Sequence, residues 1–167
     1  MGPTAPVQRE ASMTMPVRLK TYLDENKVHY TLMSHSPAYT AQAAAATLHV
    51  PGKELAKSVV VTAGSQSALA VLSASFHVNL KKLSELLGKP ARLCSEQEFI
   101  SLFPDCELGA MPPFGQLYKL PVLVDRSLEG DEEIVFNAGT HRDAIRMKYA
   151  DYKRVAQPRV VDFASKG

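Results

Sequence analysis

One apolar segment, residues 57–62, restricts the folds open to this chain more than any other feature. Its sequence, Lys-Ser-Val-Val-Val-Thr, ends in four β-branched residues, three of them valine, which is typical of a strand buried inside a sheet. The tight connection Gly64-Ser65-Gln66 follows, and a second apolar segment, residues 68–75, comes next. The pattern predicts an antiparallel hairpin with a central strand.

Capping residues mark several helices around this hairpin. Thr40 and Asn79 each precede a helix-forming stretch, where a side-chain oxygen can cap the first turn. Ser95 with Glu98 three residues later is a capping box, and Gly88 is a stop signal. The predicted helices are residues 17–26, 41–48, 80–87, 96–103 and 149–155, and further strands are predicted at 28–33, 91–94, 121–125, 133–136 and 144–147.

These elements predict a fold of the mixed α/β (α+β) class. Five to seven strands alternate irregularly with helices, so a regular βαβ repeat is not expected. A chain of 167 residues is long enough for one well-buried core and short for two. We therefore expect a flexible N-terminal extension over residues 1–14 and a single domain over residues 15–167.

Several classes of protein are disfavoured by what the sequence lacks. No apolar run approaches the roughly 20 residues of a membrane helix, so a cytoplasmic protein is expected. Cys94 and Cys106 show neither a CxxC spacing nor a nearby His pair, which argues against a zinc site or a disulfide framework. Phosphate-binding GxxxxGK[ST] and GxGxxG loops, HExxH and GxSxG are also missing, so the usual nucleotide, zinc-protease and serine-hydrolase readings lack support.

Charge is distributed unevenly along the chain. Residues 1–140 hold 12 Lys and Arg against 14 Asp and Glu, whereas residues 141–159 hold 6 Lys and Arg against 2 Asp. A basic segment suits a polyanionic partner such as RNA, because phosphate contacts release counterions. A solvated helix face explains the same pattern, and on charge alone it is the preferred interpretation.

Three features could converge on one pocket. Lys57 begins an apolar strand, where a buried ammonium requires either solvent or an anion. Gly109 opens a Gly- and Pro-rich loop whose backbone N–H groups can approach a ligand and stabilise an oxyanion. His141 follows the end of a strand and precedes the basic residues. Taken separately, each feature also has an ordinary structural explanation. Lys57 could be a strand-end lysine that reaches water, the Gly109 loop an ordinary turn, and His141 a surface histidine.

Together these residues resemble the YbaK/prolyl-tRNA synthetase-associated domain family. The resemblance rests on four motifs in order: Ala56-Lys57-Ser58-Val59, Gly109-x-x-x-Pro113-Phe114-Gly115, Pro121-Val122-Leu123-Val124-Asp125, and Gly139-Thr140-His141 followed by Ile145-Arg146-Met147. It covers roughly residues 16–163. It implies a mixed, largely antiparallel curled sheet or half-barrel with flanking helices, and hydrolysis of mischarged aminoacyl-tRNA by a free-standing, trans-acting editor.

The resemblance also implies roles for individual residues. Lys57, Gly109 and His141 match the family's catalytic positions, with His141 placing substrate or water rather than activating a protein nucleophile. The expected substrate-binding residues are Ser58, Ala110, Met111, Pro113, Phe114, Gly115, Gly139 and Thr140, and the expected tRNA-binding residues are Arg142, Arg146 and Lys148. No cofactor or metal ion is expected.

The expected partner is aminoacyl-tRNA, in particular tRNA(Pro) carrying alanine or, as second choice, cysteine. Prolyl-tRNA synthetase is a further candidate partner, and neither DNA nor a membrane is expected. Two alternatives stay open on the sequence. One is a noncatalytic tRNA- or synthetase-binding module of the same fold, and the other is a thiol-dependent hydrolase that uses Cys106.

Overall fold

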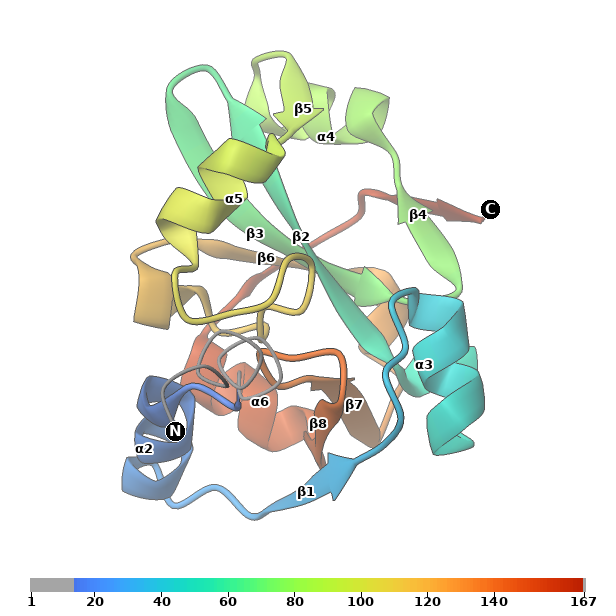
Figure 1. The fold of residues 1–167 in the computed structure, drawn as a ribbon. Coiled ribbons are helices and arrows are strands. Elements are labelled where there is room, and N and C mark those ends of the chain that lie inside the picture. The colour runs from blue at the N-terminus through green and yellow to red at the C-terminus, as the bar shows by residue number, and fades with distance from the viewer. Residues whose placement is uncertain (1–13, 167) are drawn as a thin grey trace.

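A computed structural model describes residues 14–166 of the chain (Figure 1). Its largest sheet has five strands in the order β5-β2-β3-β6-β9, with β2 (Ala56–Ala63) and β3 (Gln66–Ser73) at its centre. These two strands form the predicted antiparallel hairpin, in register from Ala56 opposite Ser73 to Ala63 opposite Gln66. The other strands are β5 (Ala91–Leu93), antiparallel to β2, and β6 (Val122–Asp125) and β9 (Arg159–Val161), which add in parallel.

A second sheet lies against the beginning of the hairpin. It contains β1 (Tyr30–Ser34), β8 (Asp143–Lys148) and β7 (Glu133–Asn137), all antiparallel. A bridge between Leu55 and Val135 connects it with the segment that leads into β2. A third sheet contains two antiparallel strands, β4 (Phe76–Val78) and β10 (Ala164–Lys166). The mixed, largely antiparallel α/β class predicted from the sequence is confirmed.

The helices surround the sheets, as Figure 1 shows. Thr40, Asn79 and the Ser95–Glu98 capping box all cap helices as predicted. Short 3-10 segments fill three connections. The helices are α2 (Val17–Glu25), α3 (Ala41–Leu48), α4 (Leu80–Leu87), α5 (Glu96–Leu102) and α6 (Tyr149–Ala156), and the 3-10 segments are η2 (Gly52–Glu54), η3 (Gly115–Tyr118) and η4 (Arg126–Leu128).

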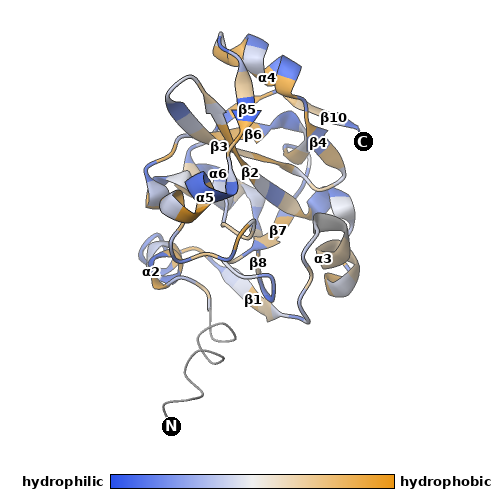
Figure 2. Cartoon of the chain, turned by 45° about the horizontal axis from the view of Figure 1, so that its top comes forward, coloured by the Kyte–Doolittle hydropathy of each residue, from blue (hydrophilic) through white to orange (hydrophobic). Residues whose placement is uncertain are grey.

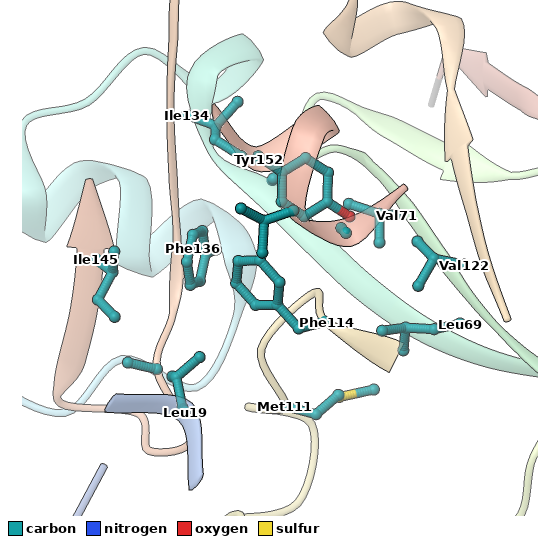
Figure 3. Close-up of a cluster of buried hydrophobic side chains, with 14 of the residues drawn as sticks. Leu19, Leu69, Val71, Met111, Phe114, Val122, Ile134, Phe136, Ile145 and Tyr152 are labelled. Carbon is teal, nitrogen blue, oxygen red and sulfur yellow. The ribbon is translucent and has the colours of Figure 1, made fainter. Parts of the chain in front are cut away.

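Apolar residues are concentrated on the central strands, whereas helices such as α4 and α5 contain both polar and apolar residues (Figure 2). In the main core the Phe114 ring meets Phe136 and Tyr152 edge-on, with centroids 5.6 and 5.3 Å apart (Figure 3). Each aromatic ring buried in this way contributes about 1.5–3 kcal/mol to folding. A second cluster, with Leu72, Leu83 and Phe163, packs α4 against the other face of the large sheet.

The sequence prediction differs from the structure in a few places. Strand β1 begins at Tyr30 rather than Val28, because the Val28 N–H still donates to the Leu23 carbonyl at the end of α2. The short strands β4, β9 and β10 were not predicted. The predicted extension, residues 1–14, lies outside the described residues except for Thr14. Within residues 14–166, every helix is too short or too polar to cross a membrane.

Candidate active site

A small cavity of about 140 Å³ opens where β2 begins. Strand β2, the Gly109 loop and the turn between β7 and β8 enclose it, together with the residues just before α3. Of the predicted site residues, Lys57, Ser58, Gly109, Met111 and His141 line the cavity. Tyr39, Thr40, Leu55, Ala56 and Asn137 complete the lining.

Backbone hydrogen bonds hold the Gly109 loop against the turn that carries the histidine. The Glu107 N–H donates to the Gly139 carbonyl over 2.8 Å, and the Gly139 N–H donates to the Ala110 carbonyl over 2.9 Å. Gly109 itself has φ +82°, a conformation that L side chains rarely adopt. The loop therefore keeps a fixed position relative to His141.

His141 is oriented by three contacts and is only 7% exposed. Its backbone N–H donates to Glu107 Oε1 over 2.8 Å, and its Nε2 lies 2.7 Å from the Leu108 carbonyl oxygen. Because a carbonyl only accepts, Nε2 carries the proton and donates it. The Tyr39 ring lies over the imidazole, with centroids 4.9 Å apart. In the neutral ring Nδ1 is then a free acceptor, and among the described residues this buried atom has no partner.

Two more buried polar atoms beside the cavity lack a partner among the described residues. They are Ser58 Oγ and Asn137 Oδ1. Burying a polar atom without a hydrogen bond costs about 1–3 kcal/mol, so such atoms are uncommon in folded proteins. Three of them around one cavity indicate a site where a ligand or water supplies the missing partners.

Lys57 places a positive charge in the same cavity. Burial lowers the pKa of its ammonium below the ordinary lysine value. No hydrogen bond or ion pair with another described residue offsets this desolvation. An anionic group entering the cavity would stabilise the charged form, so the site is suited to bind a phosphate or a developing negative charge.

Backbone donors complete the inventory of groups around the cavity. The Ala110 N–H is occupied by the Glu107 carbonyl. The N–H groups of Gly109 and Met111 have no such hydrogen bond within residues 14–166. Lys57 and the His141 acceptor line one small volume, and the unpaired N–H groups of Gly109 and Met111 belong to residues of the same lining. Groups of these kinds can polarise a carbonyl and place a water molecule against it.

Other predicted substrate-binding residues lie behind or beside the cavity rather than in its lining. Phe114 belongs to the main core, and the Pro113 carbonyl accepts a hydrogen bond from the Tyr152 hydroxyl.

Gly115 and Gly139 are sites of close packing. A Cβ added to Gly115 would lie 2.3 Å from the Leu120 oxygen, and one added to Gly139 would lie 2.3 Å from the Pro16 Cδ. Ala110 is fully buried, and the Thr140 hydroxyl donates to Asp143 and accepts the N–H of residues 142 and 143.

The predicted tRNA-binding residues do not line the cavity. Arg142 lies 4.0 Å from Glu107, and Arg146 pairs with Glu133 over 3.4 Å. Lys148 is exposed at the N-terminus of α6.

Sequence reasoning missed Asn137 and the aromatic and polar residues before α3. A signal for Asn137 does exist, because it is a polar residue at the end of an apolar strand, four positions before His141. The position of Tyr39 depends on how the segment before α3 crosses the turn after β7. The Ala38 N–H donates to the His141 carbonyl over 3.1 Å, a contact between residues far apart in the chain.

Cys106 is in a poor environment for a nucleophile. Its sulfur is buried 3.4 Å from the Tyr118 hydroxyl, and burial raises the pKa of the thiol to about 12. The thiolate is therefore scarce near neutral pH. Within the described part of the chain, no three His, Cys, Asp or Glu side chains are grouped as metal ligands would be.

Comparison with known proteins gives relatives that are similar in sequence. The chain is 41% identical over 101 residues to the multifunctional Ser/Thr-tRNA deacylase ProXp-y of Escherichia coli K12, an alignment that spans 59% of this chain and 60% of that protein. It is 23% identical over 141 residues to the prolyl-tRNA editing protein ProX of Acetoanaerobium sticklandii, covering 81% of this chain and 86% of ProX.

Solved structures share the fold. The crystal structure of the hypothetical protein APE2540 superposes with a TM-score of 0.81 at 21% identity, covering 89% of this chain and 99% of that one. A crystal structure described as a candidate trans-editing enzyme for prolyl-tRNA synthetase superposes with a TM-score of 0.77 at 24% identity, covering 89% and 95%. The family model of the aminoacyl-tRNA editing domain matches residues 35–155, which include the whole cavity lining. The chain thus belongs to the aminoacyl-tRNA editing domain family.

Proposed function

We propose that this protein is an aminoacyl-tRNA deacylase that hydrolyses the ester of a mischarged tRNA in trans. The observation that carries the proposal is the cavity itself. It combines Lys57 with three buried polar atoms that have no partner among the described residues, in a fold of the editing family. A volume of about 140 Å³ suits a small amino acid, so the body of the tRNA must lie outside it.

Water is the proposed nucleophile. An aminoacyl ester is already activated, so positioning and charge stabilisation suffice. His141 Nδ1 accepts a hydrogen bond from the attacking water or from the ribose hydroxyl next to the ester. The N–H groups of Gly109 and Met111 face the oxyanion that forms as water attacks the carbonyl. Lys57 stabilises negative charge on the terminal nucleotide or the ester.

The cavity favours an amino acid with a hydroxyl group. Asn137 Oδ1 is a buried acceptor without a partner among the described residues, and Ser58 Oγ accepts or donates. Serine and threonine carry a donor that either atom can accept. The relative from Escherichia coli is named for Ser- and Thr-tRNA. We therefore place serine and threonine first and treat alanine and cysteine on tRNA(Pro), the expectation from the sequence, as the second choice.

A panel of charged tRNAs tests the proposal. Purified protein is mixed with tRNA carrying serine, threonine, alanine or cysteine, and with Pro-tRNA(Pro), and the loss of the ester is followed. Rapid hydrolysis of at least one mischarged tRNA, with correctly charged Pro-tRNA(Pro) preserved, is expected. Equal cleavage of Pro-tRNA(Pro) contradicts an editing role. If every ester survives while tRNA binds, the noncatalytic binding module is the correct description.

A further inference from the structure

A second and larger hollow lies away from the catalytic cavity. Its volume is about 730 Å³, and it borders the tip of the β2–β3 hairpin, the end of α4 and the segment leading into β6. We refer to it as the hairpin groove. Its lining residues are Val61, Ala63, Ser65, Gln66, Ser67, Ala68, Leu87, Lys89, Leu102, Lys119, Leu120, Pro121, Val122, Leu123 and Arg159.

The charged residues that line the hairpin groove are all cations. Lys89, Lys119 and Arg159 come from three separate segments, and all three are exposed. Neither an acidic nor an aromatic side chain is among the lining residues that the structure describes. No ion pair within residues 14–166 neutralises any of the three. The groove therefore carries a local positive charge that is not compensated by carboxylates of the described chain.

The basic segment noted in the sequence is different. Arg146, Lys153 and Arg154 pair with Glu133, Glu129 and Asp151 at 3.4, 3.2 and 3.5 Å, so carboxylates compensate much of its charge. Arg159, at the end of that segment, instead lines the hairpin groove at the start of β9. Uncompensated charge attracts a polyanion more strongly than a charge that already has a partner.

The three cations have fixed attachment points. The Lys89 side chain lies over Gly64 at the hairpin tip, 3.3 Å from the position of an added Cβ. Lys119 ends η3 in the left-handed region, with φ 61°. Arg159 is paired with Leu123 in the large sheet. A cation on a rigid backbone loses less entropy when it meets a phosphate than one on a mobile loop.

The groove also presents hydrogen-bond donors. The Leu69 N–H donates to the Pro121 carbonyl, on the β6 side of β3. Every second residue of a strand directs its backbone N–H to the same side, so the Ser67 N–H points to the β6 side of β3, like that of Leu69. Ser67 lies before the part of β3 that pairs with β6, which begins at Leu69. With the Gln66 amide nearby, these donors and cations suit the oxygens of phosphate groups.

We propose that the hairpin groove binds the phosphate backbone of the tRNA body while the 3′ end occupies the catalytic cavity. The inference rests on the proposed function. Strand β2 joins the two sites, and the six steps from Lys57 to Ala63 span about 20 Å at roughly 3.3 Å per residue. Without aromatic side chains for base stacking, contact through phosphates and sugars, independent of sequence, is expected.

The test compares two triple variants that remove equal charge. Lys89→Gln/Lys119→Gln/Arg159→Gln removes the groove cations. The matched control, Lys81→Gln/Arg126→Gln/Lys166→Gln, changes exposed cations that line neither site. Binding of uncharged tRNA is measured by fluorescence anisotropy at several salt concentrations. The groove variant should bind roughly tenfold more weakly, and its slope of log K against log[salt] should shrink by about 2 to 3, since each phosphate contact contributes about 0.9.

Hydrolysis is measured separately, with charged tRNA and with the same amino acid esterified to a CCA trinucleotide. The ratio of tRNA to CCA activity should fall in the groove variant and stay constant in the control. A groove variant with the wild-type salt slope overturns the proposal. Binding of an acidic peptide in the groove with unchanged tRNA affinity also overturns it, in favour of a protein partner. If no ester is hydrolysed by the wild-type protein, the proposed function fails, yet the salt slope still decides whether the groove binds RNA.

Discussion

Asp125 and His141 are both buried polar residues, but their surroundings differ. Asp125 is 2% exposed and follows the apolar part of β6. Its Oδ1 accepts the N–H groups of Phe163 and Ala164 at 2.8 and 2.9 Å, and its Oδ2 accepts the Ser127 N–H at 2.8 Å. Three donors satisfy this carboxylate and attach the C-terminal segment to the large sheet.

At the cavity the pattern is reversed. His141 Nδ1, Asn137 Oδ1 and Ser58 Oγ are buried without a partner among the described residues, and the desolvated Lys57 lies beside them. The fold holds these groups in an unfavourable state, which under the proposed function a bound substrate would relieve. Burial alone therefore does not separate structural from functional polar residues in this protein. His35 Nε2 and Asp131 Oδ2 also lack a partner among the described residues, but neither residue lines the cavity. What distinguishes the cavity is that three such atoms gather around one volume.

Replacing Asp125 should have the largest effect on stability. Asp125→Ala leaves three backbone N–H groups without their acceptor, which should lower the free energy of unfolding by about 3 kcal/mol or more. Urea unfolding followed by circular dichroism measures the change. Asp162→Ala, at an exposed neighbour, is the control and should unfold like the wild type. Equal midpoints for the two variants would show that the Asp125 hydrogen bonds contribute little.

Lys57→Met should give the opposite result. We expect hydrolysis of charged tRNA to fall about 100-fold, the loss typical of a removed charge-stabilising group. The unfolding free energy should stay the same or rise, because methionine fills the site without a desolvated charge. Stopped-flow or quench kinetics and urea unfolding give the two numbers. Lys81→Met on α4 is the matched control, and an equal loss of activity there would remove Lys57 from the mechanism.

Asn137→Ala should change the choice of amino acid more than the overall rate. If Asn137 Oδ1 accepts the hydroxyl of serine, its loss should lower kcat/KM for Ser-tRNA about tenfold relative to Ala-tRNA. Competition between the two charged tRNAs in one reaction measures the ratio directly. An unchanged ratio would assign Asn137 to the support of the cavity wall rather than to recognition.

Local signals explain why much of the fold could be predicted. Thr40, Asn79 and Ser95 cap helices through hydrogen bonds within three residues, so their sequence context is sufficient. The hairpin β2–β3 is likewise adjacent in sequence. Strands β4 and β10 pair Phe76 with Lys166, a contact between distant segments of three residues each. Such short strands have too little sequence of their own to reveal a periodicity.

The candidate site likewise could be predicted only as far as local sequence motifs reach. Lys57, Gly109 and His141 were brought together by a resemblance between motifs, and all three line the cavity. The motif could not tell which members of the Gly109 loop face the cavity and which face the core. Phe114 turns into the cluster with Phe136 and Tyr152, and only the packed structure shows that direction. Asn137 was missed because its role depends on the absence of a partner, a three-dimensional property.

The pH dependence of stability should reveal the desolvation of Lys57. In the unfolded chain its pKa is the ordinary 10.5, and in the folded protein the pKa is lower. Between these values the unfolded state binds more protons, so wild-type stability rises with pH there. Below the pKa of the folded protein, Lys57 is charged in both the folded and the unfolded state, and the free-energy cost of burying its ammonium no longer changes with pH. The stability advantage of Lys57→Met should therefore shrink as the pH rises towards 10.5, as urea midpoints at several pH values would show.

Cys106→Ser should have the smallest effect on activity, with kcat within about twofold of the wild type. The thiol resembles Asp125 more than His141, because its sulfur already has the Tyr118 hydroxyl at 3.4 Å and its pKa is raised to about 12. A nucleophilic cysteine requires a thiolate and an adjacent base, and burial opposes the first. Initial rates on the best substrate of the tRNA panel measure the effect, and slow labelling of Cys106 by iodoacetamide would agree with it. A loss of activity larger than tenfold in a folded Cys106→Ser protein would replace water with the thiol as the nucleophile. It would also mean that a partnered buried group can be catalytic here, against the distinction drawn between Asp125 and His141.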